Sequence, residues 1–155
     1  MKKIRAVAIV IKGDEVLLMF RKKKDKEYVV FPGGAVEERE TIGEAIIREI
    51  KEETTLDISI ERLLYHQIYD NDTEHYFYLC KFLSGEPKLD DESIEKKMSS
   101  AENVYEPRWV ALETIPRLLL YPLEIRDLLI EDRKSDFQNC PKEMHIKMTE
   151  LRHAL

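Results

Sequence analysis

The sequence predicts an α/β fold in which a mixed β-sheet lies between helices. Short apolar runs bounded by turn residues, at residues 5–11, 15–20, 57–68, 76–82 and 108–112, are typical of strands. Two other segments, which begin near residues 42 and 122, have apolar residues at helical spacing. A length of 155 residues favours a single domain for these elements.

The first two strands are expected to form a hairpin. Residues 5–11 and 15–20 flank a short polar turn that contains Gly13. The basic start and the first apolar run together mimic a secretion signal, but the run is short and no small-residue cleavage site follows it. Two cysteines without a disulfide or zinc pattern favour a reducing compartment. We therefore expect a cytoplasmic protein without a membrane partner.

A helix is predicted to begin at about Ile42, because Thr41 and Glu44 form a capping-box pattern. The apolar run that precedes it ends in a proline followed by Gly33 and Gly34. Glycines at such a place permit a turn and let the backbone come close to a ligand. The segment therefore predicts the order strand, glycine loop and helix.

Three acids share one face of this helix, since Glu49, Glu52 and Glu53 are spaced i, i+3 and i+4 and repel one another. The apolar stripe that begins at Ile42 covers the same side, so these carboxylates point toward the interior. Partly buried carboxylates need a partner, because desolvation of an uncompensated ion is costly. Hard divalent cations such as Mg²⁺ or Mn²⁺ are the natural partner. The alternative is a solvated acidic helix, against which the inward direction and the neighbouring glycines argue.

The spacing from Gly34 to Leu56 resembles the signature of the Nudix hydrolases, Gly-x5-Glu-x7-Arg-Glu-U-x-Glu-Glu-x-Gly-U, where U is aliphatic. One fixed position differs, because Thr55 stands where the family usually has glycine. A β-branched residue in a left-handed helix cap costs roughly 1–2 kcal/mol, so we expect a local change at the helix exit. The resemblance extends across most of residues 3–130 and implies the Nudix-type α/β/α sandwich.

The resemblance also implies roles for these residues. Glu49, Glu52 and Glu53, together with the carbonyl of Gly33, would bind one or more divalent cations, with Mg²⁺ as the cofactor and Mn²⁺ as a substitute. Arg48 and Glu40 would orient the carboxylates, which agrees with the ability of a guanidinium to offset their repulsion. Either Glu49 or Glu52 would act as the base. The implied reaction is attack of activated water on a phosphorus of a diphosphate linkage.

A further metal ligand is expected from a loop downstream of the helix. Glu102 is the first candidate and Glu106 the second, because both precede the strand at residues 108–112. A solvated loop acid is an equally open interpretation for either residue. The charged stretch that contains Asp90 and Glu95 is interpreted as simply hydrated or mobile.

The substrate is the least determined part of the prediction. Arg21 at a strand end could bind phosphate, and Tyr28, Tyr76 and Tyr105 could stack on a base. Ordinary packing and a solvated basic loop are the alternatives. The net charge of −6 argues against duplex nucleic acid. A nucleoside triphosphate, including an oxidised one, is the first choice. Dinucleoside polyphosphates, ADP-sugars and a nucleotide-binding module without turnover stay open, and an RNA end has little support.

The C-terminal part is expected to be helical. A helix with Pro122 at its start is predicted from apolar residues at positions 121, 125, 128 and 129. Residues 1–133 then form the hydrolase domain, and residues 134–155 form an extension of the same domain. In that extension Met144, Met148, Leu151 and Leu155 predict a final amphipathic helix. It is expected to pack on its own domain, with a homodimer contact or a cover over the substrate cleft as alternatives.

Overall fold

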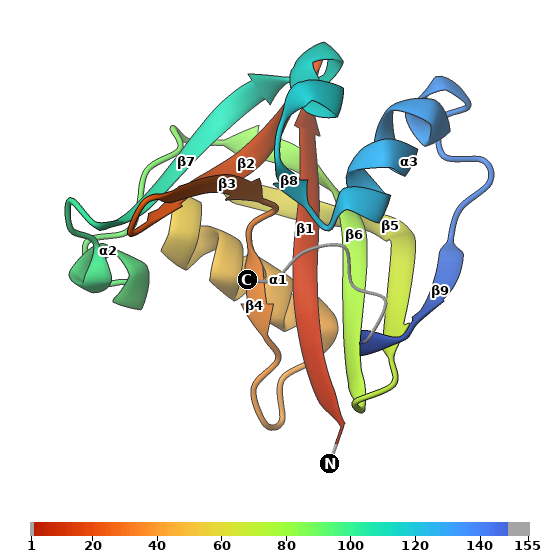
Figure 1. The fold of residues 1–155 in the computed structure, drawn as a ribbon, viewed down its shortest axis with the longest axis horizontal. Helices are drawn as coiled ribbons and strands as arrows, with labels where there is room; N and C mark the ends of the chain where they lie inside the picture. Colours follow the sequence, from red (N-terminus) through yellow and green to blue (C-terminus); the bar gives the residue numbers. More distant parts are fainter. Residues whose placement is uncertain (1, 149–155) are drawn as a thin grey trace.

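The computed structural model describes residues 2–148, and Figure 1 shows a curved sheet with helices around it. The strands are β1 (Lys3–Lys12), β2 (Glu15–Lys23), β3 (Lys26–Val30), β4 (Gly33–Ala35), β5 (Asp57–Tyr69), β6 (Thr73–Ser84), β7 (Asn103–Ala111), β8 (Leu120–Tyr121) and β9 (Lys142–Ile146). The helices are α1 (Ile42–Thr54), α2 (Ile94–Met98), a 3₁₀ helix (Leu112–Arg117) and α3 (Leu123–Lys134). No helix within residues 2–148 is long and apolar enough to cross a membrane.

The strands form one mixed sheet in the order β8-β3-β2-β1-β6-β5-β9, with β4 paired to β1 and β7 paired to β2. β1 pairs with β6 in parallel and with β2 and β4 in antiparallel orientation. The predicted hairpin is present, because Ile11 lies opposite Val16 and Lys12 lies opposite Glu15. β4 carries Gly33 and so places the glycine loop beside the central strand of the sheet.

The two faces of the sheet pack against different helices. Side chains at even positions of β1, such as Ala6 and Ala8, form one core cluster with Ile46 and Ile50 of α1. Side chains at odd positions of β1 form a second cluster with Ile125 and Leu129 of α3, which follows Pro122 as predicted. Because successive side chains of a strand point to opposite faces, α1 and α3 cover opposite sides. The predicted α/β/α sandwich is therefore confirmed.

Helix α1 starts as predicted, and it ends in a residue with a left-handed backbone conformation. Thr41 Oγ1 accepts the Glu44 N–H and Glu44 Oε1 accepts the Thr41 N–H, each at 3.0 Å, which completes the capping box. At the exit Thr55 adopts φ 63° and ψ 1°, and its N–H donates to the Lys51 carbonyl at 3.0 Å. The expected local change at the exit is therefore wrong, because Thr55 itself takes the left-handed conformation that glycine favours.

The prediction of a final helix is also wrong for the part of it that the structure describes. Met144 lies in β9, which pairs in parallel with β5, whereas Leu151 and Leu155 lie outside the described residues. Side chains along β9 alternate between half-buried and exposed, which is the period of a strand. An ion pair also holds the strand, because Lys142 Nζ lies 2.6 Å from the buried Asp132 Oδ1 of α3. Tertiary pairing has thus overridden an ambiguous helical spacing.

Candidate metal centre and active site

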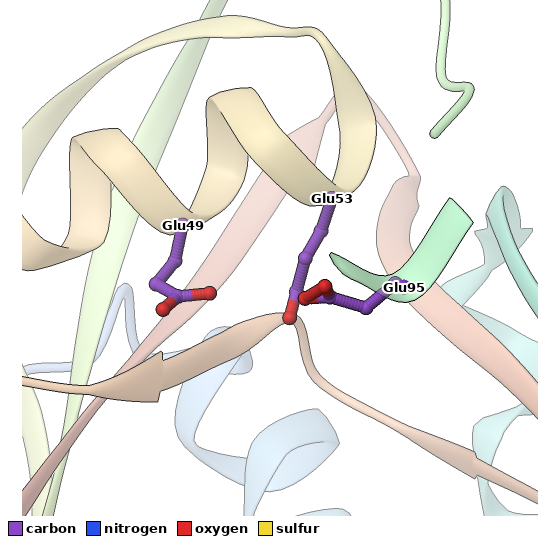
Figure 2. A group of neighbouring side chains, drawn as sticks. All are labelled: Glu49, Glu53 and Glu95. Carbon is purple, nitrogen blue, oxygen red and sulfur yellow. The ribbon is translucent and has the colours of Figure 1, made fainter. Parts of the chain in front are cut away.

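Three carboxylates from two helices meet beside β4. Glu49 and Glu53 of α1 and Glu95 of α2 each offer an oxygen, and these oxygens all lie within 4.8 Å of one another. Figure 2 shows Glu49 and Glu53 extending from α1 on the same side, with Glu95 approaching from α2. Glu53 is only 8% exposed. Glu52 is outside this group, with a side chain 43% exposed, and lines the cleft beside it.

The two glycines of β4 allow the acids of α1 to come this close. The Gly33 N–H donates to Glu53 Oε2 at 3.0 Å. A Cβ on Gly34 would lie 2.4 Å from the carboxyl carbon of Glu49, which is closer than real side chains approach. A larger residue at position 34 would therefore displace the Glu49 carboxylate from the place that it occupies in the group. The contact that the structure shows for Gly33 is made by its amide, and the carbonyl ligand stays a prediction.

Arg48 connects the acids of the helix to the loop before it. Its Nε and Nη2 donate to the two oxygens of Glu40 at 2.7 and 2.9 Å, and its Nη1 donates to Glu49 Oε1 at 2.8 Å. Nη2 also donates to the Ala35 carbonyl at 3.1 Å. The Arg48 contact, followed by the backbone N–H of Glu37, lowers the pKa of Glu40 to about 2. A fully ionised Glu40 thus fixes Arg48, which in turn orients Glu49.

Burial is the main cause of a raised pKa at both Glu49 and Glu53. At Glu53 repulsion by Glu49 and Glu95 adds to it, and the Gly33 N–H opposes it. At Glu49 the contact with Arg48 opposes the effect of burial. Burial and mutual repulsion make the charged forms of these carboxylates unfavourable, and the positive charge nearby does not match theirs. An all-oxygen set of three carboxylates fits a hard divalent cation such as Mg²⁺ or Mn²⁺.

Glu95 is the acid that the sequence interpretation missed. The segment before α2 is docked on the end of α1, because the Lys88 and Asp90 amides donate to the Thr54 and Glu52 carbonyls at 3.0 Å. The interpretation of this stretch as simply hydrated is therefore wrong for Glu95. One local signal was available, since Ser93 lies two residues earlier and its Oγ caps α2 by accepting the Lys96 N–H at 3.1 Å.

The two acids expected from the downstream loop lie elsewhere. Glu102 is exposed, and its carbonyl accepts the Lys24 N–H at 2.7 Å in a turn contact. Glu106 pairs with Arg108 at 2.8 Å on the surface. Neither residue belongs to the group of three carboxylates or to the lining of the cleft.

A cleft of about 880 Å³ adjoins the carboxylates. Arg21, Tyr28 and Tyr105 line it together, with the Arg21 guanidinium carbon 3.7 Å from the centre of the Tyr105 ring and 5.7 Å from that of Tyr28. Arg21 is held there because its Nε donates to the Val104 carbonyl at 3.1 Å and its Nη2 to Asn103 Oδ1 at 2.9 Å. Three of the four predicted substrate residues are thus neighbours.

The fourth predicted substrate residue does not line the cleft. Tyr76 donates to Glu74 Oε1 at 3.1 Å and stacks on His66, with ring centres 4.1 Å apart. The expectation for Tyr76 is corrected by the alternation of β6, because its neighbour His75 faces the cleft instead. Burial, followed by the charge of Arg5, lowers the pKa of His75 to about 4, so this ring is neutral at neutral pH.

The sequence and the fold were compared with known proteins. The model of the NUDIX domain matches residues 2–130. The chain is 39% identical over 98 residues to putative nudix hydrolase 1 of Caenorhabditis elegans, covering 57% of this chain and 26% of that protein. It is 32% identical over 108 residues to the ADP-ribose pyrophosphatase of Methanocaldococcus jannaschii, covering 64% of each. The chain thus spans about a quarter of the length of the first relative and 64% of the length of the second.

Solved structures agree at the level of the fold. The crystal structure of a NUDIX hydrolase from Nitrosomonas europaea superposes with a TM-score of 0.73 at 20% identity, over 94% of this chain and 79% of that one. The family model covers most of the chain, including β4 and both helices that contribute Glu49, Glu53 and Glu95. On this evidence the chain belongs to the Nudix hydrolase family.

Proposed function

We propose that the protein is a Mg²⁺-dependent hydrolase that cleaves a diphosphate linkage within a nucleoside diphosphate derivative. The observation that carries the proposal is the group formed by Glu49, Glu53 and Glu95, whose oxygens lie within 4.8 Å of one another beside a cleft. A purely structural contact between α1 and α2 gains nothing from three carboxylates that repel one another. This argues against the alternative of a nucleotide-binding module without turnover.

Each acid has a proposed role. Glu49, Glu53 and Glu95 would hold the cation, and Arg48 with Glu40 would keep Glu49 in position. Glu52 is proposed as the base, because it lines the cleft outside the group of three and its side chain is 43% exposed. A bound cation would lower the pKa of water and neutralise charge that develops on the phosphate oxygens.

The proposed reaction adds one water across the linkage. The oxygen of water forms a bond to phosphorus, and the bond from that phosphorus to the bridging oxygen breaks. Glu52 accepts the proton of the attacking water, and the bridging oxygen leaves with the electron pair. A nucleoside triphosphate would give a monophosphate and pyrophosphate.

A nucleoside triphosphate, including an oxidised one, is the first proposed substrate. Arg21, Tyr28 and Tyr105 offer it a cation and two aromatic rings, and stacking on an aromatic ring contributes about 1–3 kcal/mol per base. ADP-ribose is the second candidate, because a relative at 32% identity is an ADP-ribose pyrophosphatase. Tyr69 and His75 also line the cleft, and their polar atoms would be available to contact the sugar of such a substrate.

The remaining parts of the proposal concern the surroundings of the protein. The two cysteines are free and buried, which supports a reducing compartment such as the cytoplasm. The net charge of −6 supports a small-molecule substrate over duplex nucleic acid. A homodimer stays a prediction that oligomeric state in solution would test.

The test is a panel of nucleotides incubated with Mg²⁺ or Mn²⁺ and analysed for products. Nucleoside triphosphates should give monophosphate and pyrophosphate, whereas ADP-ribose should give AMP and ribose 5-phosphate. Glu52→Gln should reduce the rate by about 10²–10⁴-fold while the circular dichroism spectrum stays unchanged. Glu102→Gln is the matched control and should keep full activity. Binding of nucleotides without any turnover would instead support the binding module and contradict the proposal.

A further inference from the structure

Thr55 stands at the one position where the chain departs from the Nudix signature. Its φ of 63° lies in the left-handed region, where glycine is favoured over a β-branched residue. A threonine at this position is therefore unfavourable for the local backbone, and the helix exit would be served better by glycine. A benefit elsewhere is expected to offset this disadvantage.

The benefit lies in a contact of the side chain. Thr55 Oγ1 donates to the Glu86 carbonyl at 3.0 Å, a hydrogen bond that glycine could not make. Two backbone hydrogen bonds lie close by, from the Lys88 amide to the Thr54 carbonyl and from the Asp90 amide to the Glu52 carbonyl, both at 3.0 Å. The last carbonyls of a helix have no partner within the helix, so these amides satisfy them.

The docked segment leads directly to the metal centre. It runs from Glu86 to Ser93, whose side chain caps α2, and Glu95 follows two residues later. Figure 2 shows the Glu95 carboxylate, which extends from α2, beside the carboxylate of Glu53 from α1. Within the described part of the chain, the hydroxyl of Thr55 makes the one side-chain hydrogen bond between the end of α1 and this segment.

We propose that Thr55 is a positioning residue for the metal centre. Its hydroxyl holds the segment that leads to Glu95, and it thereby sets the affinity of the carboxylate group for a divalent cation. The inference rests on the proposed function only in taking Glu49, Glu53 and Glu95 as cation ligands. The contrasting view is that Thr55 ends the helix and its hydroxyl has no effect on the site.

The test separates stability from cation binding. Thr55→Gly should raise the unfolding temperature in EDTA, or leave it unchanged, because glycine suits the left-handed cap. The same variant should bind Mn²⁺ about 3- to 10-fold more weakly in titrations without nucleotide, followed by electron paramagnetic resonance. Thr55→Ala should show the same loss, whereas Thr55→Ser keeps the hydroxyl and should bind like the wild type. A purely structural role of Thr55 would change the unfolding temperature alone and leave the Mn²⁺ affinity of all three variants equal to that of the wild type.

A double-mutant cycle with Glu95 completes the test. If Thr55 acts through Glu95, then Thr55→Gly should have little effect on Mn²⁺ affinity in a protein that already carries Glu95→Gln. Equal affinities of the wild type and Thr55→Gly would overturn the inference, as would a loss that persists in the Glu95→Gln background. Absence of Mn²⁺ binding by the wild type would overturn the proposed metal centre, and the role of Thr55 with it.

Discussion

Replacing Glu53 with glutamine should make the metal-free protein more stable. The carboxylate is 8% exposed and accepts the Gly33 N–H at 3.0 Å. Glutamine has nearly the same volume, and its amide oxygen can accept the same hydrogen bond. The substitution therefore removes the charge that burial and the neighbouring acids make unfavourable, and leaves the packing in place.

The size of the effect follows from the geometry of the group. Two full charges 4.8 Å apart repel by about 3.5 kcal/mol at an effective dielectric constant of 20. The charge is spread over two oxygens, and Arg48 lies 2.8 Å from Glu49, so we expect a net gain of about 2 kcal/mol. For a chain of this size, about 2–4 °C accompany each kcal/mol, which predicts an unfolding temperature about 4–8 °C higher.

The pH dependence has a definite sign. Folding raises the pKa of Glu53, so the folded protein favours the protonated carboxyl. The stability that this group contributes is fully present below its unfolded pKa, and it is lost as pH rises through the folded pKa. The advantage of Glu53→Gln should therefore grow as pH rises through the folded pKa and should vanish at acid pH, where the wild-type carboxyl is protonated.

The assay is thermal unfolding in EDTA and then with Mg²⁺ or Mn²⁺. A cation that binds only the folded state at 100 times its dissociation constant stabilises by about 2.7 kcal/mol. The wild type should gain this stability, and Glu53→Gln should lose most of the gain. Glu102→Gln, the same substitution on an exposed acid outside the group, should behave like the wild type. A Glu53→Gln protein that is less stable in EDTA, or that responds to cation like the wild type, would refute the reasoning.

Two further substitutions test the support of the carboxylates. Gly34→Ala should weaken Mn²⁺ binding at least about tenfold, because its Cβ would lie 2.4 Å from the Glu49 carboxyl carbon. Gly43→Ala is the control, since its Cβ would meet a flexible side chain at 3.3 Å, and calorimetric titration should find its affinity within twofold of the wild type. Arg48→Lys removes the two hydrogen bonds that the guanidinium donates to Glu40. It should lower kcat by about 10- to 100-fold without unfolding the protein. An unchanged kcat would show that Arg48 does not position the carboxylates.

Helix α1 could be predicted from the sequence because its signals are local. The capping box of Thr41 and Glu44 lies within four residues, and the spacing of Glu49 and Glu53 follows from helical geometry alone. The packing of α1 against even positions of β1 confirms the direction of its apolar stripe. Short-range patterns of this kind need no knowledge of the rest of the chain.

Glu95 could not be predicted in the same way, because its position depends on contacts distant in sequence. The segment before it is docked by the backbone amides of Lys88 and Asp90, and a backbone contact has no residue-type signature. Met144 is a similar case, since its spacing to Met148 is compatible with a helix. Parallel pairing with β5 and the contact of Lys142 with Asp132 favour the strand.

The support for the three carboxylates is unequal, and this inequality indicates where a cation is most needed. Glu49 has Arg48 at 2.8 Å, and Arg48 is in turn fixed by Glu40. Glu53 has only the neutral Gly33 N–H at 3.0 Å as a hydrogen-bond partner within the described residues, although it is more deeply buried. Positive charge is therefore less available at Glu53 than at Glu49, which Arg48 contacts directly. The least compensated charge gains most from a divalent ion. Removal of the Glu53 charge should therefore give the clearest contrast between the two properties, with a more stable metal-free fold and weaker binding of the cation.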